Sequence, residues 1–390
     1  MADLNDIRER ITALDNNLLQ LLAERRELAI EVAKSKQATS KPVRDQDREQ
    51  QLLVRLINQG RTLGLNSNYI TKIYHSVLED SVLLQQAFLQ QIKNPNSARS
   101  VARVAFLGDK GSYSNLASKK YFARYDDDLV ELGFPTFQEI ITSVEKGQAD
   151  FGMLPIENTS SGSINDVYDL LQSTSLSIVG ELTQPIEHSL ITSCDTDLAK
   201  IKTIYAHPQP FAQCSLFLSA HPHIKIEFVD SSSAAMAKVK ELASDDVAAI
   251  GSITGGELYG LTPIRTGLAN QTENYSRFIV VARKPVDVAA QIPAKTTFIM
   301  STGQQAGCLV EALLVLKEHN VNMTKLESRP IQGNPWEEMF YVDVKGNIED
   351  GPMQTAFDKL RGMTRYFKVL GCYPVEEVLP TRVSVTEALK

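Results

Sequence analysis

The sequence is poor in cysteine, and its four cysteines lie far apart and form no Cys-x-x-Cys pair. That spacing argues against a disulfide framework and against a structural zinc site, and it fits a reducing compartment. No stretch approaches the roughly 18 consecutive apolar residues of a transmembrane helix. The charged start, MADLNDIRER, lacks the apolar segment of a secretory signal. We therefore expect a cytoplasmic protein without a membrane partner.

The sequence also lacks a basic excess and a dinucleotide fingerprint. Its 390 residues carry a formal net charge of −7, which argues against a nucleic-acid partner. No Gly-x-Gly-x-x-Gly pattern occurs, so a dinucleotide cofactor has little support. The pair His221-Pro-His223 is without the further ligands that a metal site requires. The residues indicate a protein for small organic anions that uses no metal and no cofactor.

Three regions follow one another along the chain. Residues 1–93 lack strand patterns and contain few prolines and glycines, which predicts an all-α domain of three helices. Residues 94–103 begin with NPNSARS and have the composition of a linker. In residues 104–284, short apolar runs such as RFIVVAR alternate with amphipathic segments, which predicts an α/β domain of mostly parallel, buried strands. Residues 295–375 read βαββαβ, the pattern of a ferredoxin-like α+β domain.

Charged and polar residues interrupt the apolar stripes of the predicted helices. Arg25 occupies a heptad position that is otherwise apolar in the first helix, and Arg8 and Lys36 border the same stripe. In the third helix, Ser81 and Gln85 fall on the apolar face. Buried polar groups must be satisfied by partners or by a ligand.

The second predicted helix opens with Asp45, Arg48 and Glu49. One explanation of the misplaced charges is internal pairing of Arg25 with Asp45 or Glu49. Another is that long side chains at the edge of the stripe reach the solvent. The whole set together favours a polar pocket for an anionic ligand. Because two further helices of one chain do not cover so long an apolar stripe, we also expect an intertwined dimer.

The N-terminal region resembles a known family. The segments IRERI, LLAERREL, VAKSK, PVRDQDRE and EDSVLLQQ are similar to the helical chorismate mutase domain of proteobacterial phenylalanine-pathway enzymes. The resemblance implies rearrangement of chorismate to prephenate, with Lys36 and Gln85 donating to the ether oxygen as negative charge grows there. It implies that Glu49 takes the substrate hydroxyl. The implied clamping and orienting residues are Arg8 (from a partner chain), Arg25, Asp45, Arg48 and Ser81.

In the middle region, polar loops follow the ends of predicted strands. The stretch FGMLPIENTSSGSI, residues 151–164, is either a simple turn or the wall of a site. The loops FLGDKGSYSN, YAHPQPF, VDSSSAA and NYSRF are further examples. Ligands of α/β domains bind at the carboxyl ends of the strands, so these loops are expected to converge on a small carboxylic acid. The serines of VDSSSAA are more typical of helix caps, and His207 is an acid, a ligand or a structural residue.

The same loops resemble prephenate dehydratase in DKGSYS, PIENTSSGSI, HPQPF, DSSSAAM and YSRF. The resemblance implies two lobes around a cleft, similar to periplasmic binding proteins, and removal of water and CO2 from prephenate. The family's essential threonine is replaced by Ser276, which keeps the hydroxyl, and we expect it to remain catalytic. Glu157 is either an acid or, as we favour, a brace for its loop. The implied substrate contacts are Ser112, Tyr113, Asn158, Thr159, Ser160, Ser161, His207, Arg277 and Phe278.

The last region resembles an ACT domain, an amino-acid-sensing module. GCLV and ESRP match the family's phenylalanine-binding pair, with Cys308 where the family usually has alanine. A glycine at a helix start lets a carboxylate approach the backbone N–H groups. The resemblance implies feedback inhibition by L-phenylalanine bound between paired domains. The implied effector residues are Gly307, Cys308, Leu309, Val310, Glu327, Ser328, Arg329 and Pro330.

These resemblances cover nearly the whole chain and imply a bifunctional enzyme, at least dimeric, whose partners are chorismate, prephenate and L-phenylalanine. Two other functions are possible readings of the residues. One is a non-enzymatic sensor, against which the polar cluster of the helices argues. The other is an NAD-dependent oxidoreductase acting on prephenate, against which the missing dinucleotide fingerprint argues.

Overall fold

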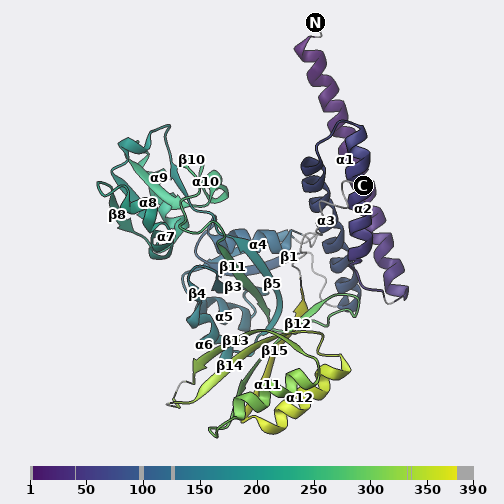
Figure 1. The fold of residues 1–390 in the computed structure, drawn as a ribbon. Coiled ribbons are helices and arrows are strands. Elements are labelled where there is room, and N and C mark those ends of the chain that lie inside the picture. The colour runs from purple at the N-terminus through teal and green to yellow at the C-terminus, as the bar shows by residue number, and fades with distance from the viewer. Residues whose placement is uncertain are drawn as a thin grey trace. The chain divides into compact units, whose positions relative to one another are not determined.

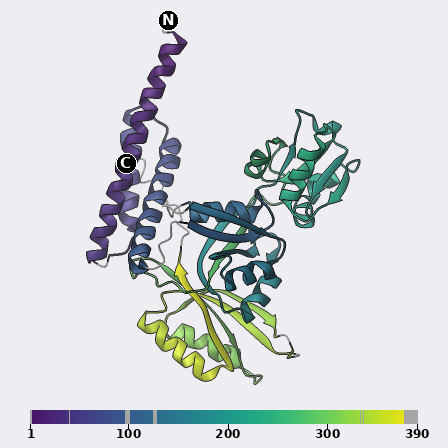
Figure 2. The same cartoon turned by 180° about the vertical axis from the view of Figure 1, so that it is seen from behind.

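The computed structural model describes residues 3–39, 41–95, 101–123, 128–331, 333–334 and 336–375. They form two compact units (Figures 1 and 2). The first contains the N-terminal helices and residues 287–293, and the second contains residues 101–286 and 294–375. Half of the expected linker, residues 96–100, lies outside the described residues.

The first unit consists of three helices, as the sequence predicts. Asp45 and Asn66 cap the second and third helices by accepting hydrogen bonds from backbone N–H groups. Residues 287–293 pack against the third helix, where the Ala289 backbone N–H donates to Gln90 Oε1 at 2.9 Å. No described helix has both the length and the apolar composition that a membrane span requires. The helices are α1 (Leu4–Thr39), α2 (Gln46–Thr62) and α3 (Ser67–Lys93).

The amino-terminal part of α1 is exposed in the single chain. Every residue from 3 to 24 is exposed, including Leu14 at 68% and Leu21 at 62%. Only Ala29 and Ala33 of this 36-residue helix are buried. The other described residues of the chain therefore leave the apolar stripe on this part of α1 exposed.

The first lobe of the second unit is built on a mixed sheet of order β2-β1-β3-β11-β5, with β4 paired to β3. Strands β1, β2 and β3 run parallel, but β11 is antiparallel to both β3 and β5. The strands are β1 (Val101–Leu107), β2 (Asp128–Phe134), β3 (Phe151–Asn158), β4 (Gly162–Ser163), β5 (Ser177–Pro185) and β11 (Tyr275–Ala282). The helices are α4 (Tyr113–Phe122), α5 (Phe137–Glu145) and α6 (Asn165–Ser173).

The second lobe is a five-stranded sheet of order β10-β6-β9-β7-β8. Strand β6 is antiparallel to both of its neighbours, but the other four strands of this sheet share one direction. In the first lobe β11 is likewise the reversed strand among β1, β2, β3, β5 and β11, so the strands of both lobes are mostly parallel, as expected. The chain crosses between the lobes twice, and the first strand after each crossing, β6 or β11, runs against the others. The elements are β6 (Ser189–Thr192), β7 (Thr203–Ala206), α7 (Pro208–Gln213), α8 (Ser215–Ser219), β8 (Lys225–Phe228), α9 (Ser232–Leu242), β9 (Val247–Gly251), α10 (Ile253–Tyr259) and β10 (Thr262–Arg265). A short 3-10 helix, Leu198–Lys200, precedes β7.

The C-terminal part of the second unit has the predicted βαββαβ order. Its antiparallel sheet has the order β13-β14-β12-β15, which is the ferredoxin-like topology. The elements are β12 (Ala294–Ser301), α11 (Cys308–Glu318), β13 (Asn322–Pro330), β14 (Glu338–Lys345), α12 (Gly351–Met363) and β15 (Tyr366–Pro374).

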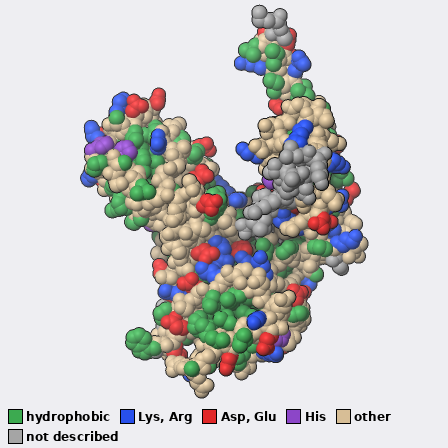
Figure 3. Space-filling view, viewed as in Figure 1, with side chains coloured by type: hydrophobic (Ala, Val, Ile, Leu, Met, Phe, Trp, Pro, Cys, Tyr) green, Lys and Arg blue, Asp and Glu red, His purple; other side chains and the backbone are tan. Residues whose placement is uncertain are grey.

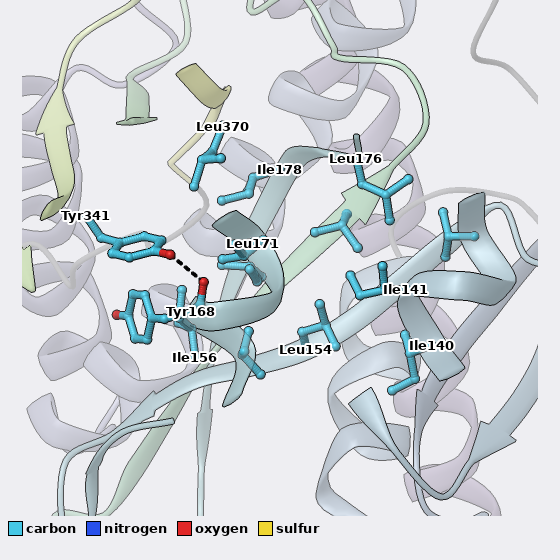
Figure 4. Packing of buried hydrophobic residues seen from close by; sticks show 14 of the residues in the cluster. Ile140, Ile141, Leu154, Ile156, Tyr168, Leu171, Leu176, Ile178, Tyr341 and Leu370 are labelled. Atoms are coloured by element: carbon cyan, nitrogen blue, oxygen red, sulfur yellow. Dashed lines mark hydrogen bonds between the residues drawn. The ribbon is translucent and has the colours of Figure 1, made fainter. Parts of the chain in front are cut away.

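The first lobe and the C-terminal domain share one hydrophobic core. Leu154, Leu171 and Ile178 of the lobe pack in one cluster with Tyr341 and Leu370 of the domain (Figure 4). The Tyr341 hydroxyl also donates to the backbone oxygen of Tyr168 at 2.5 Å. Close-packed cores transmit displacements between their elements. A displacement of the C-terminal domain is therefore expected to shift the sheet of the first lobe.

Candidate functional site

In the helical unit, the cations of α1 face the polar residues of α3. Arg25 donates from Nη1 to the Ser81 hydroxyl and to the backbone oxygen of Val77, the latter at 3.2 Å. Lys36 Nζ donates to Gln85 Oε1 at 3.1 Å and to the backbone oxygen of Val43. The structure therefore brings together four of the residues that the sequence singled out, and it does so between two helices.

This cluster is shielded from water. Ser81 and Gln85 are each only 7% exposed. Burial lowers the pKa of the Lys36 ammonium, and the nearby carboxylates of Asp45 and Glu49 offset this only in part. A half-buried cation beside an amide and a hydroxyl can hold an anionic ligand or stabilise negative charge that develops in a reaction.

The second helix contributes a pairing that the sequence analysis missed. Arg44 donates from Nε and Nη2 to Glu49 Oε2, both at 3.2 Å, and Glu49 is buried. Asp45 accepts from the Arg48 backbone N–H at 3.0 Å as the cap of α2. Arg25 makes its hydrogen bonds with α3, so its internal pairing with Asp45 or Glu49 is not the arrangement observed.

Arg8 lies far from this cluster within one chain. It is exposed on α1, seventeen residues before Arg25, which corresponds to about 25 Å along an α-helix. An arginine at that distance reaches the Arg25–Lys36 cluster only if a second chain supplies it.

In the second unit, a cleft of about 1360 Å³ lies between the two lobes. It exceeds the roughly 300–1,000 Å³ of ordinary small-ligand pockets, as expected of lobes in an open arrangement. Of the predicted substrate contacts, those that line it are Ser112, Tyr113, Asn158, His207, Ser276 and Phe278. Among the described residues that line the cleft there is no lysine or arginine, which leaves backbone N–H groups, hydroxyls, side-chain amides and imidazoles as donors to an anion there.

Two helices begin at the cleft with serine caps. Ser112 caps α4 by accepting from the Asn115 backbone N–H, and Ser231 caps α9 by accepting from that of Ala234. Both caps line the cleft. The free N–H groups and the positive dipole end of such a helix attract a carboxylate.

Three side-chain amides form a closed ring at the base of the cleft. Asn158 Nδ2 donates to Asn274 Oδ1 at 2.7 Å, Asn274 Nδ2 donates to Gln213 Oε1 at 3.1 Å, and Gln213 Nε2 donates to Asn158 Oδ1 at 3.1 Å. All three are less than 9% exposed. Asn158 Nδ2 also donates to Ser276 Oγ at 3.0 Å. Among the described residues, the Ser276 hydroxyl has no acceptor for its own hydrogen, which leaves that hydrogen for a molecule in the cleft.

His188 and Tyr113 extend this network. His188 Nε2 lies 2.7 Å from Gln213 Oε1, and the Tyr113 hydroxyl lies 2.9 Å from His188 Nδ1. Burial lowers the pKa of His188, although its hydrogen bond to Gln213 partly opposes the shift. Since Gln213 Oε1 only accepts, the neutral imidazole carries its hydrogen on Nε2. The sequence analysis missed His188, Gln213 and Asn274.

Arg277, a predicted substrate contact, is not among the residues that line the cleft. Its Nη1 lies 2.5 Å from Asp343 Oδ2 and 3.5 Å from Glu181 Oε2, and its Nε lies 3.1 Å from Glu157 Oε1. Lys295 pairs with Glu181 in the same cluster. Successive residues of a strand point to opposite faces, so Ser276 faces the cleft while Arg277 faces the C-terminal domain.

Thr159, Ser160 and Ser161 also lie outside the cleft lining, contrary to prediction. The Ser160 and Ser161 backbone N–H groups both donate to Asn158 Oδ1 at 2.9 Å. The Thr159 hydroxyl bonds to the Glu273 backbone oxygen and to the backbone N–H of Tyr275, the first residue of β11. Ser160 and Ser161 therefore hold the Asn158 side chain in place. Glu157 pairs with Arg277 and Lys325, an arrangement that agrees with a brace.

The C-terminal domain contacts the first lobe through β13. Ser163 donates to Glu327 Oε2 at 2.6 Å, and Arg329 binds both carboxylate oxygens of Asp169 at 2.9 and 2.8 Å. Ser328 and Pro330 lie on the alternate face of the strand and are exposed. The GCLV segment is placed at the start of α11, where Gly307 has a φ of +93° and is the N-cap, followed by Cys308 and Leu309 and by the exposed Val310.

The Arg25–Lys36 cluster and the amide ring beside Ser276 indicate an enzyme with two sites. One site lies in the helical domain and the other in a two-lobed α/β domain. A family model described as prephenate dehydratase matches residues 104–286, and one described as chorismate mutase type II matches residues 7–86. A bifunctional chorismate mutase/prephenate dehydratase of Enterobacter agglomerans is 58% identical over 374 residues, 96% of each chain. The chain belongs to the bifunctional chorismate mutase/prephenate dehydratase family.

Solved structures match a little over two thirds of the chain. A prephenate dehydratase from Arthrobacter aurescens in complex with L-Phe is 26% identical with a TM-score of 0.64, covering 72% of this chain and 93% of that one. A structure described as GqqA, a novel type of quorum quenching acylases, is 31% identical with a TM-score of 0.62, covering 70% of this chain and 98% of that one. Both matches are longer than the region of the dehydratase family model, residues 104–286.

Proposed function

We propose that the helical unit binds chorismate at the Arg25–Lys36 cluster and rearranges it to prephenate. Arg25 and Ser81 bind a carboxylate, and Lys36 and Gln85 donate to the ether oxygen as its bond to carbon breaks. Arg48 adds a further cation, and Glu49 takes the substrate hydroxyl while Arg44 holds it in place. A fixed cation and an amide at the point where charge develops lower the barrier without covalent chemistry, and clamping of the flexible substrate supplies the rest.

The mutase site is completed by a second copy of the chain. This proposal rests on the exposed apolar stripe of α1 and on the distance between Arg8 and Arg25. Figure 3 shows green, hydrophobic side chains along the free part of α1. A second α1 covers this stripe and carries its own Arg8 to the first chain's cluster, so each of the two sites uses both chains.

In the cleft of the second unit, prephenate loses CO2 and water. The bond from the ring to its carboxylate breaks, its electron pair completes the aromatic ring, and the hydroxyl leaves as water after taking one proton. Ser276 donates toward that hydroxyl and regains its proton from solvent. The N-termini of α4 and α9, capped by Ser112 and Ser231, bind the carboxylates. The single observation that carries this assignment is that Asn158 holds Ser276 Oγ as an acceptor and leaves its hydrogen for the cleft.

We also propose that L-phenylalanine binds the C-terminal domain as an ACT domain and inhibits the dehydratase. Support comes from the ferredoxin-like topology, from the L-Phe complex of the Arthrobacter aurescens structure and from the contacts of β13. Arg329 holds Asp169, which lines the cleft, so a movement of β13 changes the cleft wall. Replacing Asp169 by asparagine is expected to raise the L-phenylalanine concentration needed for inhibition, while calorimetric binding of L-phenylalanine persists.

The two activities separate by mutation. Arg25→Ala is expected to abolish prephenate formation from chorismate and to leave the conversion of added prephenate intact. Ser276→Ala is expected to do the reverse, with a loss of at least about 10²-fold in dehydratase kcat, whereas Ser276→Thr keeps the activity. Loss of both activities in either variant, with the protein folded, would contradict the assignment of one site to each unit.

A further inference from the structure

Asn274 lies in the amide ring but not in the wall of the cleft. It is 4% exposed and belongs to the segment through which the chain returns from the second lobe to β11. Asn158 and Gln213, its two partners in the ring, both line the cleft together with Ser276. Asn274 therefore acts on a bound substrate only through these neighbours.

The ring has a defined direction. Asn158 Oδ1 accepts from the backbone N–H groups of Ser160 and Ser161, which only donate, and Asn158 Nδ2 donates to the backbone oxygen of Tyr275, which only accepts. These contacts fix the amide of Asn158. Its orientation in turn requires Asn274 to present Oδ1 to Asn158 and Nδ2 to Gln213.

This direction decides the state of the Ser276 hydroxyl. Asn158 Nδ2 shares its two hydrogens among Asn274 Oδ1, the Tyr275 backbone oxygen and Ser276 Oγ. Because an amide nitrogen does not accept, the serine oxygen is the acceptor in this contact and its own hydrogen is left for a molecule in the cleft. We infer that Asn274 is a positioning residue of the dehydratase reaction, which keeps Asn158 and Gln213 in the orientation that leaves the Ser276 hydrogen for the departing hydroxyl. The inference rests on the proposed function, in which Ser276 donates toward the substrate.

The substitution Asn274→Asp tests this with almost no change of shape. An ionised carboxylate accepts from Asn158 but places a second acceptor against Gln213 Oε1, so the ring breaks. A protonated carboxyl donates to Gln213 and accepts from Asn158, so the ring closes again. Burial raises the pKa of such a carboxyl above its ordinary value of about 3.9, and ring closure is then reached at moderately acidic pH.

Other titratable groups near the ring do not mimic this behaviour. His188 contacts Gln213 on its far side, and burial lowers its pKa. Tyr113, beyond His188, is kept protonated because burial raises its pKa. Glu187 and Glu273, in the adjoining segments, are exposed. These groups are common to the variant and the unmodified enzyme, so their titration cancels in the ratio of the two rates.

The experiment measures dehydratase kcat and KM for prephenate in the full-length protein between about pH 5 and 9. At high pH, the kcat of Asn274→Asp is expected to be about 10²-fold lower than that of the unmodified enzyme. As the pH falls, the ratio of the two kcat values is expected to rise. Asn274→Ala, which removes both ring bonds without adding a charge, is expected to lose kcat by a constant factor at every pH. In both variants KM changes less than kcat.

Asn270→Asp is the matched control. Asn270 lies in the same returning segment, and its side chain bonds to Ser215 Oγ at 2.9 Å and to the Leu216 backbone N–H at 3.0 Å, away from the ring. Its kcat ratio is expected to be constant with pH. A pH-independent ratio for Asn274→Asp, or an unchanged kcat, would overturn the positioning role even where Ser276→Ala is inactive. Full activity of Ser276→Ala would instead overturn the proposed role of Ser276 itself.

Discussion

Ser276 and Arg277 are adjacent on β11, yet their side chains meet different parts of the molecule. Ser276 Oγ accepts from Asn158 in the cleft, whereas Arg277 Nη1 lies 2.5 Å from Asp343 of β14. One strand thus carries both the proposed proton donor and the centre of a buried ion cluster. This arrangement links the chemistry of the cleft to the domain proposed to sense phenylalanine.

Replacing Arg277 by methionine is expected to destabilise the second unit more than it affects substrate binding. The change leaves Glu157, Glu181 and Asp343 without their shared cation, and removing one member of a buried ion pair costs about 3–5 kcal/mol. Denaturant unfolding measures the loss, and prephenate KM is measured on the folded protein. Arg365→Met removes an exposed pair with Glu337 and serves as the control, at about 0–1 kcal/mol. Unchanged stability together with a raised KM would restore Arg277 as a direct substrate contact.

The mutase is expected to lose kcat/KM for chorismate at alkaline pH. Lys36 must be protonated to donate to the ether oxygen, and burial lowers its pKa below the ordinary value of about 10.5. The protonated form dominates below this pKa, so the midpoint of the decline in kcat/KM, which reports the free enzyme, falls below 10.5. An active Lys36→Arg variant should lose this decline, because guanidinium stays charged. The same midpoint in both proteins would exclude Lys36 as its origin.

Mixing two inactive variants tests whether Arg8 acts across the dimer. In a heterodimer of Arg8→Ala and Arg25→Ala chains, one site receives both native arginines and the other receives neither. If unfolded together and refolded at equal amounts, half of the dimers are mixed, so about a quarter of all sites regain function. Chorismate consumption measures the recovery. If Arg8 instead served its own chain, each site would lack one arginine and the mixture would stay inactive.

Gly371 tests the packing of the C-terminal domain on the first lobe. A Cβ at this position would lie 2.0 Å from the backbone oxygen of Ile178 on β5, so Gly371→Ala forces β15 and β5 apart. We expect a lower thermal unfolding temperature and weaker inhibition by L-phenylalanine. Gly362 lies on α12 with open space around it, so Gly362→Ala is expected to be neutral or stabilising by up to about 1 kcal/mol. Equal effects of the two substitutions would argue against close packing at Gly371.

The sequence predicted the parts of the fold that local patterns determine. The lack of strand patterns indicated three helices, heptad positions placed Arg25 on the apolar stripe with Lys36 at its border, and the βαββαβ order predicted the C-terminal topology. The reversed directions of β6 and β11 were not predicted, because they depend on where the chain crosses between lobes. Periodicity within a segment carries no information about such crossings.

In the candidate sites, too, some residues could be predicted from local sequence patterns and others could not. Asn158 and Ser276 were found because each stands in a polar loop that resembles a motif of the prephenate dehydratase family. Asn274 is 116 residues from its partner Asn158, and Gln213 is 55 residues away, so only the fold brings the ring together. Arg277 was assigned to the cleft as a neighbour of Ser276, but strand alternation and a carboxylate from another domain place it elsewhere.

The most direct test of the account is incubation of the full-length protein with chorismate alone, with prephenate and phenylpyruvate followed over time. The account predicts transient prephenate followed by phenylpyruvate and CO2, without any added cofactor. Accumulation of prephenate with no phenylpyruvate would contradict the assignment of Ser276 and the cleft, and an absence of chorismate consumption would contradict the assignment of the helical unit.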